Sequence, residues 1–99
     1  MGASFETVVI EAQTVDEARL KWNGEVEQDL HENGHSYSGT IGMLGEGFEL
    51  RSDVGIFASV EHANRYIENE QEKWDGAIGV RAKLKSGKLV FVVGGWCSS

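Results

Sequence analysis

The stretch AIGVRAKLKSGKLVFVV, residues 77–93, predicts two β-strands joined by a tight turn at Ser86 and Gly87. Apolar and polar residues alternate along both halves, as they do in strands with one buried face. A two-residue turn fixes the pairing of the strands and hence the residues on each face. The inner face would hold Val80, Ala82, Leu84, Leu89, Phe91 and Val93. The outer face would hold Arg81, Lys83, Val90 and Val92.

A strand and a helix are predicted at the start of the chain. Residues 5–12 (FETVVIEA) alternate and are rich in β-branched side chains, which favours a first strand. Thr14 followed by Glu17 forms a capping box, so a helix is expected to begin at Val15. Its apolar stripe consists of Val15, Ala18, Trp22, Val26 and Leu30. The Asn-Gly pair at 33–34 predicts the end of this helix.

The middle of the chain predicts a second hairpin and a second helix. Residues 40–51 separate into an apolar and a polar face if a two-residue turn lies at Gly45 and Glu46. Ser59 then caps a helix that extends to the Asp-Gly pair at 75–76. One side of that helix carries Val60, Ala63, Ile67, Gln71 and Trp74.

The predicted order of elements is therefore β-α-β-β-α-β-β. Two helices packed on one face of a mostly antiparallel sheet form the simplest α+β architecture for this order. A ferredoxin-like variant with one added strand is the nearest named arrangement. With 99 residues, the chain is expected to form a single α+β domain, residues 1–99.

Composition and charge indicate which classes of protein this chain can belong to. The chain is 40% hydrophobic and 25% charged, which is typical of globular domains, and it has no membrane-length apolar run. The single cysteine, Cys97, excludes an internal disulfide. The net charge is −7, and residues 1–49 carry −8 while residues 50–99 carry +1. We therefore expect a cytoplasmic protein that binds neither membranes nor nucleic acid directly.

Residues 31–35 (HENGH) match the H-E-x-x-H motif, in which two histidines bind Zn²⁺ and the glutamate activates a bound water. The Asn-Gly pair inside the motif ends the helix before His35, and no third histidine follows at a recognised spacing. The competing interpretation is a surface His31 near a helix C-terminus, where the helix dipole favours its charged form. We expect no metal and no catalytic residue here.

Two other regions are candidates for binding. The loop 34–40 (GHSYSGT) has the polar composition of ligand-binding loops, although local hydrogen bonds in a turn would explain it equally well. Its candidate residues are His35, Tyr37, Ser38 and Thr40. On the last hairpin, Arg81 and Lys83 either lie over two valines or form a partner surface.

The two helices and the C-terminal segment supply the remaining candidates. An acidic face would consist of Glu25, Glu27, Asp29 and Glu32 on the first helix, or of Glu68, Glu70 and Glu72 on the second. Such a face either keeps the chain soluble or meets a basic partner. Trp96 follows two glycines and either closes over the sheet or anchors an interface.

Three patches resemble small, largely uncharacterised proteins encoded by bacteriophages and their bacterial relatives: GHSYSGTIG (34–42), KWDGAIGV (73–80) and VVGGWCSS (92–99). Those proteins carry a Gly-His-x-x-Tyr-[Ser/Thr]-Gly-Thr-Ile stretch and a Gly-Trp-[Ala/Cys]-Ser end. The middle patch departs from their Lys-Trp-x-Gly-x-Ala-like stretch. The resemblance implies no catalytic residue. The residues it marks are His35, Tyr37, Ser38, Gly39, Thr40, Gly95 and Trp96.

Three functions follow, in order of preference. By analogy with other short acidic phage proteins, the first is a non-catalytic inhibitor that docks stoichiometrically on a host defence protein. The second is a protein that sequesters a nucleotide signal through His35, Tyr37, Arg81 and Lys83. In one version of this hypothesis the binding site lies across the interface of a homo-oligomer. The third is a zinc hydrolase built on HENGH. We expect a host protein as the partner and no cofactor.

Overall fold

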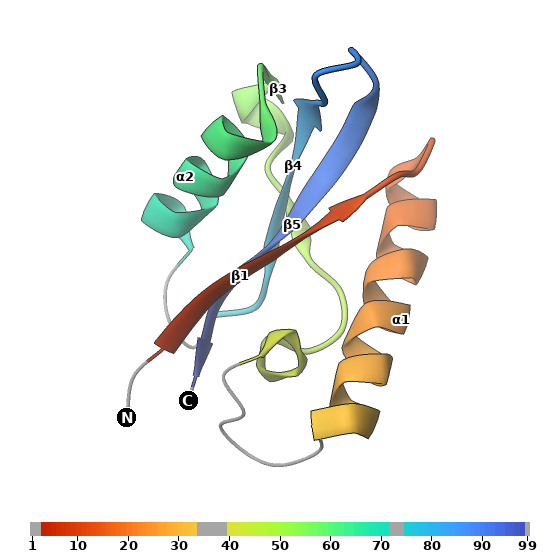
Figure 1. Ribbon diagram of the computed structural model, residues 1–99, viewed down its shortest axis with the longest axis vertical. Coiled ribbons are helices and arrows are strands. Elements are labelled where there is room, and N and C mark those ends of the chain that lie inside the picture. Colours follow the sequence, from red (N-terminus) through yellow and green to blue (C-terminus); the bar gives the residue numbers. More distant parts are fainter. Residues whose placement is uncertain (1–2, 34–39, 72–74, 99) are drawn as a thin grey trace.

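The computed structural model describes residues 3–33, 40–71 and 75–98 (Figure 1). The elements in chain order are β1 (Ala3–Ile10), α1 (Val15–Asn33), η1 (Ile41–Leu44), β2 (Glu49–Leu50), η2 (Ser52–Val54), β3 (Ile56–Phe57), α2 (Val60–Glu70), β4 (Ile78–Lys83) and β5 (Leu89–Ser98), where η denotes a 3₁₀-helix. In the described part of the chain, neither helix is long and apolar enough to cross a membrane.

β5 lies in the interior of a five-stranded sheet, between β1 and β4, and is antiparallel to both. The short strands β2 and β3 pair with the other edge of β4 and run parallel to it. The sheet is thus mixed but mostly antiparallel, and the two helices pack against it. The expected α+β class is confirmed.

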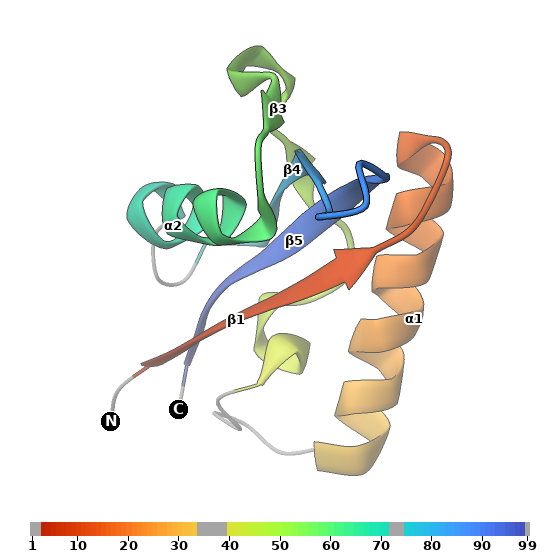
Figure 2. The same ribbon diagram turned by 45° about the horizontal axis from the view of Figure 1, so that its top comes forward.

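The two helices cover opposite faces of the sheet, whereas the sequence analysis placed both on one face (Figures 1 and 2). Val90 and Val92 of β5 pack with α2, and the alternate residues Phe91 and Val93 pack with α1. The connections explain this. β1–α1–β2 crosses the sheet from one side to the other, and β3–α2–β4 returns in the opposite direction. Because crossovers are strongly right-handed, opposite directions require opposite faces.

The β4–β5 hairpin is shifted by one residue from the predicted register. Its turn has three loop residues, 85–87, because the Leu84 N–H donates to the Lys88 carbonyl at 2.9 Å. Gly87 adopts φ +89°, as expected in a type I turn followed by a bulge. A shift of one residue exchanges the two faces of a strand.

This exchange changes what each face carries. Arg81 now pairs with Phe91, and Ala82 pairs with Val90. Val90 and Val92, which were expected on the outer face, are buried against α2. The predicted basic surface containing these two valines is therefore wrong, and Arg81 lies on the α1 side of the sheet.

The predicted hairpin over residues 40–51 is also wrong, since α1 binds this segment in another conformation. The Asp29 carboxylate accepts hydrogen bonds from the Thr40 hydroxyl at 2.5 Å and from the Gly42 N–H at 2.8 Å. The Trp22 indole N–H donates to the carbonyl of Gly45 at 3.2 Å. These contacts fold residues 41–44 into the 3₁₀-helix η1 and hold it against α1.

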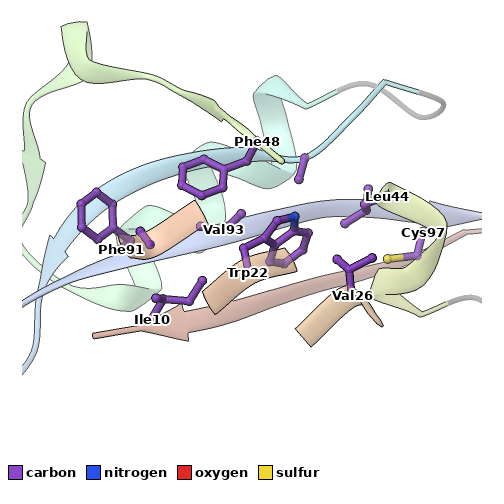
Figure 3. Packing of buried hydrophobic residues seen from close by; sticks show 10 residues of the cluster. Ile10, Trp22, Val26, Leu44, Phe48, Phe91, Val93 and Cys97 are labelled. Atoms are coloured by element: carbon purple, nitrogen blue, oxygen red, sulfur yellow. The ribbon is translucent and has the colours of Figure 1, made fainter. Parts of the chain in front are cut away.

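Both predicted helix starts are confirmed. The Thr14 hydroxyl accepts from the Glu17 N–H at 3.1 Å, and the Ser59 hydroxyl accepts from the His62 N–H at 3.2 Å. α1 continues without a break to Asn33, but α2 ends at Glu70, before the predicted stop at 75–76. Figure 3 shows the core beneath α1, where Trp22 lies among Val26, Phe48, Val93 and Cys97.

Candidate functional site

The loop candidates divide into those that the structure describes and those that it does not. His35, Tyr37 and Ser38 lie outside the described residues, so the predicted loop site stays a prediction. Thr40 is described, and its hydroxyl donates to Asp29. This contact ties η1 to α1, which gives Thr40 a role in the fold.

Trp96 closes over the sheet, the first of its two predicted alternatives. Its ring packs against Phe5 with 5.4 Å between the ring centroids. The indole N–H donates to the Glu68 carbonyl at 3.0 Å, and the backbone N–H donates to the side chain of Gln71 at 2.8 Å. Trp96 thus joins β5 to the C-terminal end of α2.

The HENGH motif is described only in part. His31 and Glu32 are exposed on the last turn of α1, and Glu32 accepts a hydrogen bond from Gln28 at 3.3 Å. Its second histidine, His35, lies outside the described residues. Within the described ranges, no three His, Cys, Asp or Glu side chains are grouped closely enough to hold a metal ion.

Cys97 has the environment of a core residue. Its side chain is fully buried, and the thiol donates to the Gly95 carbonyl at 3.7 Å. Burial, with smaller contributions from the charges of Glu6 and Asp29, raises the pKa of Cys97 to about 12. The thiol is therefore protonated at neutral pH and is a poor nucleophile.

An open hollow of about 430 Å³ lies where β2, the start of β4 and the end of α2 meet. Its charged lining residues are Glu46, Glu49, Arg51, Glu70 and Asp75. Arg51 donates to Glu49 at 3.2 Å, and the described lining includes no histidine or cysteine. The charged groups of its described lining are therefore four carboxylates and one guanidinium.

The outer face of α1, the face turned away from the sheet, is the first exposed surface with a distinctive composition. Leu20 on this face is 73% exposed, and Gly24 lies one turn further along. The predicted acids Glu25, Glu27 and Glu32 are all exposed, and the described residues include no cation paired with them. We call the surface of Leu20, Gly24 and Glu27 the α1 outer face. Glu25 and Glu32 lie beside it, on one flank of the helix.

The second surface lies on the α1 side of the sheet at the β4–β5 hairpin, between β3 and the start of α1 (Figure 2). We call it the hairpin-end patch and define it by Ile56, Arg81, Lys83 and Leu89. Ile56 is 48% exposed and Leu89 is 47% exposed. Ile56 pairs with Arg81 across β3 and β4, and Lys83 pairs with Leu89 across β4 and β5, so these side chains share one face.

Arg81 occupies the centre of the hairpin-end patch. Its guanidinium carbon lies 5.4 Å from the centroid of the Phe91 ring, a cation–π geometry. Sequence reasoning proposed Arg81 and Lys83 but missed Ile56, Leu89 and the contact with Phe91. The one available sign was Gly87, because a glycine at the third loop position also suits a three-residue turn.

Comparison with known proteins identifies no relative. No family model, no curated protein and no solved structure matches this chain.

Proposed function

We propose that this chain is a non-catalytic binding protein that docks on a basic partner protein through the α1 outer face. The observation that carries the proposal is Leu20, a large apolar side chain left 73% exposed on a helix whose residues Ala18, Trp22 and Val26 are buried against the sheet. A single exposed leucine is common on protein surfaces. Here it adjoins a second feature that the fold does not require.

That second feature is Gly24. A Cβ built on Gly24 would meet nothing within 4 Å, so no contact within the described chain requires a glycine. Glycine in a helix interior costs about 1 kcal/mol relative to alanine. Because glycine has no side chain, the backbone of a partner can approach the helix closely at this position, beside the exposed Leu20. Binding of a partner would therefore explain why the helix keeps a destabilising residue.

The charges on and beside the α1 outer face indicate the chemistry of the partner. Asp29 faces inward and binds η1, whereas Glu25, Glu27 and Glu32 point into solvent. Uncompensated carboxylates around an apolar contact complement lysine and arginine side chains, and they accelerate association at low salt. The resemblance to phage proteins adds that the partner would be a host protein, inhibited by stoichiometric docking.

Affinity capture with matched variants tests this proposal. Immobilised wild-type protein is incubated with an extract of the host, and the captured proteins are compared with those of Leu20→Lys, Glu27→Lys and Glu68→Lys. Glu68 is an exposed residue of α2, on the other side of the sheet, so it controls for the charge change. We expect one species that the wild type and Glu68→Lys retain and that both α1 variants lose.

Added salt should also slow the association with that species, because the attraction between the two surfaces is screened. A species captured equally well by all four proteins would contradict docking through the α1 outer face. An association rate that does not change with ionic strength would contradict the role of the carboxylates.

A further inference from the structure

We propose that the hairpin-end patch is a second binding site, which takes a segment of a partner protein that presents a carboxylate beside a branched apolar side chain. This site lies apart from the α1 outer face and does not depend on docking there. Its apolar contact comes from Ile56 and Leu89, and its charge comes from Arg81 and Lys83.

The charge of the patch is uncompensated within the described residues. Lys88 lies 3.0 Å from Glu11, and Lys21 lies 3.6 Å from Glu17, so these two neighbouring lysines already have acidic partners. The described part of the chain places no carboxylate within ion-pair distance of Arg81. In a chain of net charge −7, an unpaired arginine over an aromatic ring is available to bind an anionic group.

The contact with Phe91 prepares Arg81 for that role. The face of an aromatic ring holds a stacked guanidinium in a defined orientation, while the N–H groups of the guanidinium stay free to donate hydrogen bonds. Two parallel N–H groups match the two oxygens of a carboxylate. Phe91 is 4% exposed, so the arginine also covers the ring while the site is empty.

The hollows beside Arg81 indicate the size of the apolar group. One, of about 120 Å³, is lined by Leu50, Gly55 and Ile56 among others, and one of about 100 Å³ is lined by Ala12, Leu89 and Phe91 among others. Sites for drug-sized ligands have volumes of roughly 300–1,000 Å³. Hollows this small suit single side chains of a protein segment better than a nucleotide.

A larger hollow of about 480 Å³ adjoins the patch beside α1. Its two lysines, Lys21 and Lys88, are the ones paired with glutamates, which leaves little free charge for a phosphate group. A second copy of the chain is disfavoured because two molecules of net charge −7 repel each other. The same charge disfavours a nucleic acid.

Fluorescence anisotropy with a short labelled peptide that alternates glutamate and leucine tests the site. A peptide with lysine in place of glutamate and a peptide with serine in place of leucine serve as controls. We expect the glutamate–leucine peptide to bind at least about tenfold more tightly than either control, as charge-assisted hydrogen bonds and apolar burial both contribute. NMR shift changes on binding should cluster at the hairpin-end patch.

Variants locate the contact. Arg81→Gln should weaken binding of the peptide about tenfold or more, whereas Arg65→Gln, the same change at an exposed residue of α2, should leave it within about twofold. Leu89→Ser tests the apolar half, and Lys83→Gln replaces Arg81→Gln if that variant does not fold.

Four results would overturn the proposal. They are no binding at millimolar peptide, equal binding of all three peptides, equal effects of Arg81→Gln and Arg65→Gln, and tighter binding of AMP or of oligothymidylate than of the peptide at the same residues. A concentration-dependent dimer that Arg81→Gln dissociates would assign the patch to a second copy instead.

Discussion

Cys97 lies on β5 beneath α1, in the same core as Trp22, Val26 and Leu44 (Figure 3). Because burial raises its pKa to about 12, the thiol stays neutral in the folded state well above the pH at which an unfolded cysteine ionises. The chemistry of this residue is therefore set by its packing. Its position as a lone cysteine near the C-terminus, the information available from the sequence, could not establish this.

The raised pKa of Cys97 makes stability depend on alkaline pH. A free thiol has a pKa of about 8.5, so ionisation favours the unfolded chain once the pH exceeds that value. The contribution of Cys97 is fully present below about pH 8.5 and is lost progressively as the pH rises toward the folded pKa. We expect the free energy of unfolding, measured with urea, to fall between about pH 8 and pH 10, where an unfolded cysteine ionises and the buried one does not.

Cys97→Ala provides the control for that measurement, because lysines and tyrosines also titrate at alkaline pH. The variant loses some packing at every pH, but its stability should decline less steeply than that of the wild type above about pH 8.5. Identical pH profiles for the two proteins would contradict the assignment of the effect to Cys97.

At the scale of elements, α1 contains a residue that weakens it. Gly24→Ala should raise the free energy of unfolding by about 0.5–1 kcal/mol, since alanine lowers the entropy cost of the helix and its Cβ meets open space. Urea denaturation measures this change. A destabilised variant would mean that the glycine has a role within the fold, and would contradict a partner as the reason for Gly24.

The strand pair β1–β5 requires its glycine at position 94. A Cβ on Gly94 would clash with the backbone of Glu6 and Thr7 on the neighbouring strand, where backbone atoms have little room to shift. Gly94→Ala should therefore destabilise the protein by about 1–3 kcal/mol, the usual cost of overpacking. Thermal unfolding of the two glycine variants side by side should give shifts of opposite sign, and a neutral Gly94→Ala would contradict the close approach of the strands.

Elements with local determinants could be predicted from the sequence. The capping residues Thr14 and Ser59 fixed both helix starts, and the spacing of Ala18, Trp22 and Val26 identified the buried stripe of α1. These features depend on hydrogen bonds and contacts within one or two turns of chain. The α+β class followed from them and from the alternation of the long strands.

Features that depend on distant partners could not be predicted. The alternation of residues 40–51 is typical of a hairpin. In the structure, however, Asp29 and Trp22 of α1 form hydrogen bonds with backbone groups of this segment and stabilise η1 instead. The register of β4 and β5 depended on one extra loop residue, which no alternation pattern reveals. The hairpin-end patch was missed for that reason, because its composition follows from the register.

Charge acts on the whole molecule. A net charge of −7 on 99 residues, concentrated in the first half of the chain, produces repulsion that opposes the compact state. Sodium chloride should screen this repulsion, so we expect the melting temperature to rise by a few degrees between about 10 and 150 mM salt. A melting temperature that falls with salt would show that the four described ion pairs outweigh the repulsion.

The position of β5 has a consequence for how the protein forms during synthesis. Residues 89–98 are the last of the described elements to leave the ribosome, yet β1 has no other strand to pair with and both hydrophobic layers include their side chains. Neither hydrophobic layer can therefore be completed until residues 89–98 have been synthesised. We expect a chain truncated before residue 89 to stay unfolded, because it lacks the strand that joins β1 to β4.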